Sequence, residues 1–194
     1  MTPEVMREIA KAGRPRSCEA DAAILDAATE LFCELGYDGL SIEGVAAKAG
    51  VGKTTIYRRY PTKLDLVMAA SIHMGAGKIP AVETGELRGD LISIAQSYVH
   101  MLTATTVGRA IPMMIVAKGQ NPELAAAHDA YVASRRSVSI GVIRRAMDRG
   151  DLPADTDPDL VSDLLTGPIF VRVFVTGQPV TPRYVEELVD AILS

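Results

Sequence analysis

Residues 49–60 read AGVGKTTIYRRY. The triplet Gly52-Lys53-Thr54 matches the end of the phosphate-binding loop of nucleotide hydrolases, whose pattern is G-x-x-x-x-G-K-[ST]. That pattern needs a first glycine where this chain has Ala47, and it follows a buried strand. The preceding residues, LSIEGVAAKAG, instead repeat apolar side chains at i, i+3, i+4 and i+7, which is the spacing of one helix face. The segment therefore favours a helix over a nucleotide-binding loop, and a small nucleotide hydrolase stays as the weaker alternative.

Two short helices joined by a tight turn explain this stretch better. Ser41 is a typical N-cap for the first helix, and Gly50 supplies a turn residue that tolerates positive φ. The second helix is expected over residues 53–60, with Ile56 and Tyr60 facing the core. At 100° per residue the opposite face carries Lys53, Thr54, Tyr57 and Arg58. Such a pair of helices predicts a helix-turn-helix whose second helix enters the major groove of DNA.

Charge is distributed unevenly around this unit. The chain has a formal net charge of −4. Residues 44–63 nevertheless hold five basic side chains and no acidic one: Lys48, Lys53, Arg58, Arg59 and Lys63. A second basic pair, Arg14 and Arg16, precedes an acidic helix. A local basic stripe on an acidic protein is a plausible footprint for nucleic acid, although a charge cluster is often only a solvated face.

Helical patterns continue on both sides of the stretch. A helix is expected over residues 19–35, ended by Gly36, and another begins after Thr62. In the second half, three later helices share a start signal, a capping side chain followed by proline. These are Asn121-Pro122, Asp157-Pro158 and Thr181-Pro182. We expect a kink or a helix start at Pro112 and a helix break at Gly167-Pro168. No strand pattern appears, so the sequence predicts an all-α fold of about nine helices.

The domain organisation follows from the same pattern. We expect a flexible basic arm over residues 1–16, a DNA-binding domain over residues 17–72, and a helical ligand-binding and dimerisation domain over residues 73–194. No apolar run reaches the length of a membrane span, and the N-terminus lacks a secretory h-region. The two cysteines suit a reducing cytoplasm. We expect no metal site, because His73, His100 and His128 lie far apart without paired ligands. We also expect no catalytic residues, no cofactor and no membrane partner.

The region GYDGLSIEGVAAKAGVGKTTIYRRYPTKLDL resembles the DNA-binding domain of TetR-family transcriptional regulators. The resemblance rests on the Gly-Tyr pair, Ile-x-x-Val-Ala, Ala-Gly-Val at the turn, Ile-Tyr, and Lys-x-x-Leu. It implies contacts from Ser41, Tyr57 and Lys63 to phosphates. It further implies that Gly52, Lys53, Thr54, Thr55 and Arg58 face the major groove, and that Arg14 and Arg16 enter the minor groove. A packing role for Tyr57 and a solubilising tail for residues 14–16 are the alternatives.

The resemblance implies a homodimeric, cytoplasmic regulator, expected to be a repressor that a small apolar molecule releases from a palindromic double-stranded operator. The implied dimer interface lies on the helix after Asp157 and on the final helix, and comprises Val161, Leu164, Leu165, Val185, Leu188, Val189 and Ile192. Helix breaks and methionine content suggest a ligand pocket bordered by Met101, Met113, Met114, Tyr131 and Phe170, although methionines more often fill a core. The functional alternative is a DNA-binding regulator that has no ligand. The sequence names neither the effector nor the operator.

Overall fold

The computed structural model describes residues 15–75 and 84–194. Within these ranges the chain forms nine α-helices and one π-helix, and the described residues contain no strand. The expected all-α class is therefore confirmed.

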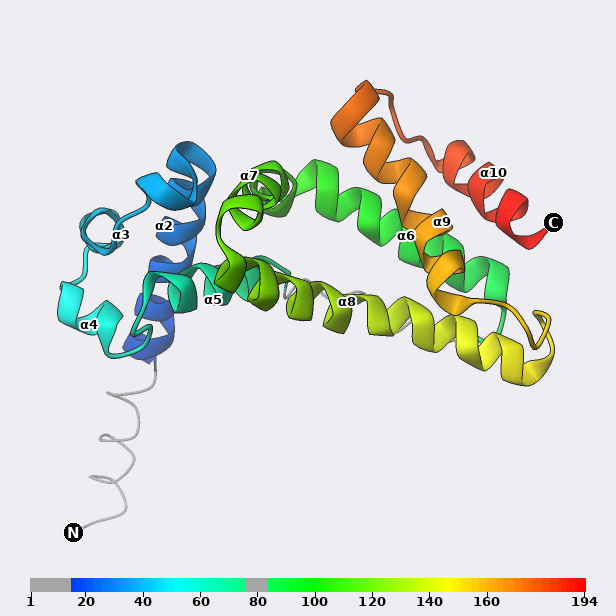
Figure 1. Ribbon diagram of the computed structural model, residues 1–194, viewed down its shortest axis with the longest axis horizontal. Helices are drawn as coiled ribbons and strands as arrows, with labels where there is room; N and C mark the ends of the chain where they lie inside the picture. The colour runs from blue at the N-terminus through cyan, green and yellow to red at the C-terminus, as the bar shows by residue number, and fades with distance from the viewer. Residues whose placement is uncertain (1–14, 76–83) are drawn as a thin grey trace, which may run out of the picture.

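Four helices form one end of the molecule, at the left of Figure 1. They are α2 (Pro15–Gly39), α3 (Ile42–Ala49), α4 (Lys53–Tyr57) and α5 (Lys63–Gly75). The helical part of α2 is interrupted at Gly36, whose φ of 71° is the left-handed conformation that glycine adopts at low cost. Glycine at this point thus ends the long part of α2, as its position in the sequence predicted.

The helices after residue 84 form a second helical layer that extends away from this end. It comprises α6 (Leu87–Ala104), α7 (Thr106–Gln120), α8 (Pro122–Arg149), α9 (Pro158–Phe170), the π-helix η1 (Val171–Thr176) and α10 (Pro182–Leu193). In Figure 1, α8 runs along the length of the molecule, and α9, η1 and α10 lie at the end opposite α4.

The three proline-containing start signals all mark helix N-termini. The side chains of Asn121, Asp157 and Thr181 each accept a hydrogen bond from a backbone N–H in the first turn of α8, α9 and α10. Proline at the first helical position lacks an N–H that would have no helical partner there, and its fixed φ suits the helix. These predictions are confirmed.

Two other proline predictions need correction, one of them in part. A helix start at Pro112 is wrong, because α7 begins at Thr106 and continues through the proline to Gln120. The alternative, a kink at Pro112, stays a prediction. The expected break at Gly167-Pro168 is wrong, since α9 continues to Phe170 and changes to π-helical geometry at Val171. Leu165 and Ile169 on either side of this proline are both 0% exposed. Burial of these side chains offsets the loss of one backbone hydrogen bond.

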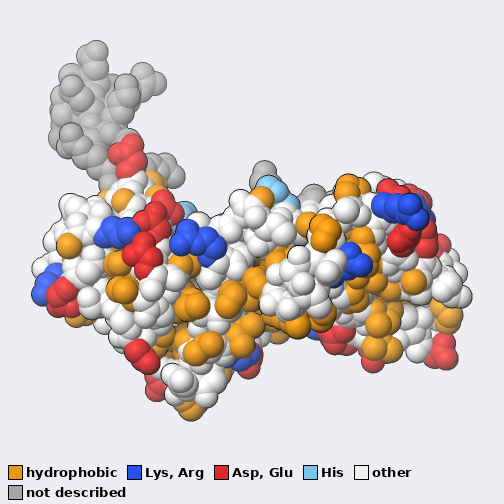
Figure 2. Space-filling model, turned by 90° about the horizontal axis from the view of Figure 1, so that it is seen from above, with side chains coloured by type: hydrophobic (Ala, Val, Ile, Leu, Met, Phe, Trp, Pro, Cys, Tyr) orange, Lys and Arg blue, Asp and Glu red, His pale blue; other side chains and the backbone are white. Residues whose placement is uncertain are grey.

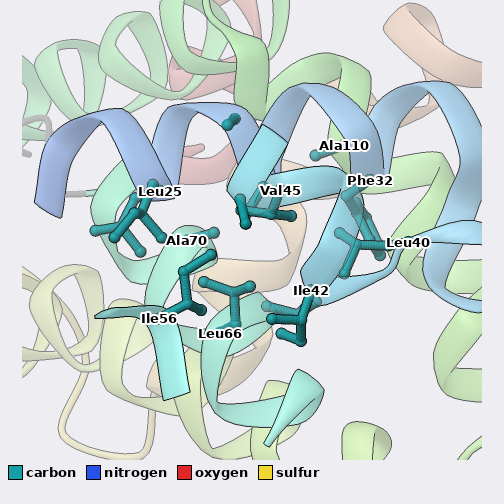
Figure 3. Packing of buried hydrophobic residues seen from close by; sticks show 14 of the residues in the cluster. Leu25, Phe32, Leu40, Ile42, Val45, Ile56, Leu66, Ala70 and Ala110 are labelled. Atoms are coloured by element: carbon teal, nitrogen blue, oxygen red, sulfur yellow. The ribbon is translucent and has the colours of Figure 1, made fainter. Parts of the chain in front are cut away.

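The core of the first four helices extends into the second layer. Figure 3 shows side chains from α2 to α5 converging, with Ala110 of α7 among them. Met114 and Ala117 of α7 and Leu124 of α8 belong to the same buried cluster. The helix-turn-helix end therefore shares its core with α7, beyond the expected boundary at residue 72.

A second buried cluster joins α6, α8, α9 and α10. Its members are Leu87, Leu91, Ile94, Ala95, Leu102, Val142, Ile143, Ala146, Val161, Leu165, Ile169, Val185 and Val189. Between α8 and α9, the hydroxyls of Ser139 and Ser162 meet at 3.0 Å, so these buried polar groups satisfy each other.

Candidate nucleic-acid interface

The turn between α3 and α4 is built by a cap at each end of α3. Ser41 accepts a 3.1 Å hydrogen bond from the backbone N–H of Gly44. Gly50 ends the helix at φ 67°, and the N–H of Val51 returns to the carbonyl of Ala46 at 3.0 Å. A side chain at position 50 would be strained at this φ. Local chemistry thus fixes the direction in which the chain enters α4.

The inner face of α4 is buried in the core that α2, α3 and α5 also form. Ile56 is 0% exposed. Beyond the helix, the Tyr60 hydroxyl donates a 2.9 Å hydrogen bond to Asp21 of α2. Burial of the ring, together with this hydrogen bond to a carboxylate, raises the pKa of Tyr60 to about 12. These contacts confirm the predicted inward direction of Ile56 and Tyr60, and they set the orientation of the short helix.

The outer face of α4 is open to solvent. Tyr57 is 48% exposed, although it is a large aromatic side chain. The other exposed residues of this face are Gly52, Lys53, Thr54 and Arg58, whereas Thr55 is half-buried. Hydroxyl and cationic groups on an exposed helix suit phosphate oxygens and base edges. Four of the five residues expected to face the groove are thus exposed, and Thr55 is the most enclosed of them.

Most basic side chains of residues 44–63 have partners within the protein. The Lys48 ammonium lies 2.8 Å from a carboxylate oxygen of Glu30 and 3.6 Å from one of Glu34. Arg59 lies 3.6 Å from Asp21. At the left end of Figure 2, where α2 to α5 lie, Lys and Arg side chains accordingly lie beside Asp and Glu side chains. Arg58 is exposed, and no ion pair involves it within the described part of the chain.

Lys53 also has a partner, which the sequence did not reveal. Its ammonium donates a 2.7 Å hydrogen bond to a carboxylate oxygen of Glu43, in the first turn of α3. This hydrogen bond lowers the pKa of the Glu43 carboxyl. Glu43 lies one position before the acid-free window that the sequence suggested. The sequence signal for this contact was the position of Glu43 in the first turn of the helix that begins after Ser41.

Lys63 lies at the first position of α5. It donates a 2.8 Å hydrogen bond to the Tyr37 carbonyl, and its ammonium is 4.4 Å from the centre of the Tyr37 ring. Lys63, which is expected to bind a DNA phosphate, therefore also links α5 to the end of α2.

The basic arm cannot be placed in this interface. Arg14 lies outside the described residues, and the backbone of Arg16 lies in the first turn of α2. Their predicted minor-groove contacts stay predictions.

The five residues expected to border a ligand pocket lie in different surroundings. Met114 is 4% exposed in the cluster around α2, whereas Met101 packs against the cluster of α6, α8, α9 and α10. Met113 is exposed, Tyr131 is half-buried, and Phe170 packs against Phe174 with ring centres 4.8 Å apart.

A cavity of about 280 Å³ lies elsewhere among the described residues. It is lined by Asp129, Val132, Ala133, Arg136, Ile140 and Asp159 of α8 and α9. Arg136 forms ion pairs with Asp159 and Asp163 beside it. The lining of this cavity includes none of the five residues expected to border a ligand pocket.

The expected dimer residues also divide into two groups. Val161, Leu165, Val185 and Val189 are at most 8% exposed, so they are enclosed by their own protomer and offer a partner little area. Leu188 and Ile192 are half-buried, and Leu164 is 45% exposed. Other large apolar side chains exposed on α9 and η1 are Leu160, Val171 and Val175.

Other kinds of site receive no support in the described ranges. Residues 15–75 and 84–194 contain no group of three or more metal-ligating side chains. In the same ranges no single helix is long and apolar enough to cross a membrane. The pair α6 and α7 reaches that length and composition together, but its helices meet at 81°.

Two family models match the chain. The model described as "Bacterial regulatory proteins, tetR family" matches residues 24–70, which contain α3 and α4. The model described as "Tetracyclin repressor-like, C-terminal domain" matches residues 81–192.

Individual proteins match over nearly the whole chain. The HTH-type transcriptional regulator YdeS of Bacillus subtilis (strain 168) is 31% identical over 180 residues, covering 92% of this chain and 90% of its own. The crystal structure of the TetR family transcription regulator SCO0332 is 31% identical with a TM-score of 0.71, covering 90% of this chain and 97% of its own. The Bacillus subtilis regulator FadR, solved with stearoyl-CoA, is 20% identical with a TM-score of 0.74, covering 89% of this chain and 97% of its own. At this identity the likeness supports the fold alone.

Proposed function

Because the chain belongs to the TetR family of bacterial regulatory proteins, we propose that it is a homodimeric repressor whose palindromic operator is released when a small apolar molecule binds. Its relatives regulate transcription and are not enzymes, so the nucleotide-hydrolase alternative is wrong. In agreement, helix α3 occupies the place where a phosphate-binding loop has a strand.

One observation carries the proposed DNA contact. The short helix α4 is anchored by the fully buried Ile56 and presents Lys53, Thr54, Tyr57 and Arg58 to solvent. Cationic and hydroxyl groups on a rigidly held helix match the donors that read a major groove. Ser41 and Lys63 flank this face and supply the proposed phosphate contacts, in agreement with the exposed position of Ser41.

A second copy of the chain is needed for useful specificity. One short recognition helix reads few base pairs, so two half-sites related by a two-fold axis are expected. The exposed apolar side chains Leu160, Leu164, Val171 and Val175 support a dimer interface on α9 and η1. In this proposal they contribute more area than Val185 and Val189, which the protomer already encloses. In this proposal the regulator acts in the cytoplasm, where the DNA lies.

The proposed effector is an apolar molecule that binds the C-terminal half of the chain. The match to a tetracyclin repressor-like C-terminal domain supports a repressor of this kind. Release then requires tighter binding to the conformation that cannot hold DNA, by about 5.5 kcal/mol for a shift from 1:99 to 99:1.

A second candidate is a regulator that occupies its operator without any ligand. Two of the five expected pocket residues, Met114 and Met101, pack in different clusters, which favours this candidate. The two candidates share the DNA interface and differ only in the response to a ligand.

The test begins with selection of bound duplexes from random DNA by the full chain. An enriched palindrome supports the operator, and failure to enrich any sequence would contradict sequence-specific binding. A thermal-shift screen of lipophilic compounds then identifies binders, and each binder is added to the operator complex. Release of DNA supports the repressor, whereas binders that stabilise the protein without loosening DNA support the ligand-independent candidate.

A further inference from the structure

Glu43 places a negative charge on the proposed DNA-binding face. It belongs to the first turn of α3, two residues after Ser41, and its carboxylate accepts the 2.7 Å hydrogen bond from Lys53. The side chains of Glu43 and Lys53 are 56% and 55% exposed, so the pair lies at the surface between α3 and α4.

A carboxylate at this place opposes general affinity for DNA. Phosphates repel it, and it neutralises a lysine that would otherwise release a counterion on binding. The other partners of lysines in this region differ. Lys48 pairs with Glu30 and Glu34 of α2, and Lys63 with the neutral Tyr37. Glu43 is thus the acidic group that holds a residue of the exposed α4 face.

The pair also restricts where the Lys53 ammonium can go. A lysine has a long flexible stem and a compact charge, so a free Lys53 would move to the nearest phosphate oxygen. The hydrogen bond to Glu43 keeps the ammonium between α3 and α4. One ammonium donor serves Glu43 and two remain, while the second carboxylate oxygen remains an acceptor.

A donor beside an acceptor matches a base pair only where the order of the groups fits. In the major groove a G·C pair shows the acceptors N7 and O6 on guanine beside the N4 amino donor on cytosine, whereas an A·T pair shows the N6 donor of adenine between the acceptors N7 and O4. At a site without this pattern the carboxylate faces acceptors or a methyl group, and the repulsion works against binding.

We infer that Glu43 is a positioning residue that holds Lys53 toward base edges and away from phosphates, so that Lys53 contributes to sequence choice rather than to general affinity. This inference rests on the proposed function, because it requires α4 to enter the groove.

The main variant is Glu43→Gln, which keeps the size of the side chain and removes its charge. Lys53 is then free to bind a phosphate in each subunit. On random-sequence duplex the log–log salt slope should become steeper by about 1.8 per dimer, which corresponds to an additional twelvefold or so loss of affinity between 50 and 200 mM salt. The ratio of operator affinity to random-DNA affinity should fall.

The matched control is Glu187→Gln. Glu187 is also exposed and pairs with a cation, Arg183 at 2.8 Å, but it lies on α10 at the opposite end of the molecule. It undergoes the same change of charge, so any effect of net charge alone appears in both variants. Equal salt slopes for Glu43→Gln and Glu187→Gln would overturn the inference.

Two more measurements test whether Glu43 acts through Lys53. In a Lys53→Met background, Glu43→Gln should no longer steepen the slope; an unchanged effect would overturn the positioning role. Lys53→Met alone should weaken operator binding more than random-DNA binding, whereas equal weakening would identify Lys53 as a phosphate ligand and also overturn it. Absence of all duplex binding by the wild-type chain would refute the proposed function together with this inference, so the two failures are distinguishable.

Discussion

The ammonium of Lys63 lies 4.4 Å from the centre of the Tyr37 ring and donates a hydrogen bond to the Tyr37 carbonyl at 2.8 Å. Tyr37 directly follows Gly36, where the long part of α2 ends. One side chain therefore joins α5 to the end of α2. An ammonium has three donors, so this hydrogen bond leaves donors for a DNA phosphate.

Variants of Lys63 should separate its structural role from its DNA contact. Lys63→Gln keeps an N–H donor and loses the charge, so it should fold normally and flatten the salt slope of DNA binding by about 0.9 per subunit. Lys63→Met also loses the donor and should lower the free energy of unfolding by about 1 kcal/mol. Urea unfolding and fluorescence anisotropy at several salt concentrations measure the two effects. A wild-type salt slope in Lys63→Gln would show that Lys63 is structural only.

Arg58 and Tyr57 should affect binding in different ways. Arg58→Ala should weaken operator binding by roughly 1–3 kcal/mol if the guanidinium reads a guanine. Tyr57→Phe should weaken binding to all duplexes, by about 1 kcal/mol for one hydroxyl hydrogen bond to a phosphate. Both side chains are exposed, so the melting temperature should not change. Arg183→Ala, on α10, is the control, and unchanged operator affinity in both test variants would reject the placement of α4 in the groove.

Local chemistry made much of the fold predictable. Ser41, Gly50 and the capping residues before the three proline starts act on their own neighbours in sequence, so the sequence alone identifies them. Continuity through Gly167-Pro168 was not predictable in this way, because it depends on the burial of Leu165 and Ile169 by other helices.

The candidate nucleic-acid interface was less predictable, because it too depends on contacts between residues that are distant in the sequence. A helical pattern identified the outer face of α4, but it did not show that Lys53 meets a carboxylate ten residues earlier in the sequence. Apolar periodicity likewise marks one face of α10 without telling whether that face meets its own protomer or a partner. In the structure Val185 and Val189 meet their own protomer.

His128 should make stability depend on pH. Its side chain is 18% exposed, and no group in the described structure hydrogen-bonds to its buried Nδ1 atom. Burial and the nearby Lys118 lower the pKa of His128, against a smaller opposite effect of Asp129. As pH falls below about 6.5, the unfolded chain is protonated at this position before the folded chain. Stability is therefore complete above that pH and is lost as pH falls toward the lowered pKa of the folded state.

The corresponding measurement is the melting temperature at about pH 7.5 and about pH 5.5, on either side of the ordinary histidine pKa. His128→Gln should lose less stability on acidification than the wild-type protein. His100→Gln, at an exposed position of α6, should keep the wild-type loss. An equal loss in all three proteins would assign the pH dependence to other groups.

The dimer interface can be tested by placing a charge on each of two apolar positions that differ in burial. Val189 is 0% exposed within its own protomer, so Val189→Asp buries an unpaired charge and should unfold the chain itself. Leu164 is 45% exposed on α9, so Leu164→Asp should leave the protomer folded. In a dimer built on α9 and η1 the same change puts two carboxylates into an apolar contact. It should therefore yield a folded monomer that binds the operator weakly, because one half-site gives too little affinity.

Val116→Asp, on the exposed side of α7, is the control for adding a charge at an exposed apolar site, and it should remain dimeric. Light scattering at micromolar concentration, circular dichroism melts and operator binding measure assembly, folding and function. A Leu164→Asp dimer as stable as the wild-type dimer would move the interface away from this face of α9, and a wild-type monomer that binds the operator tightly would refute the dimer.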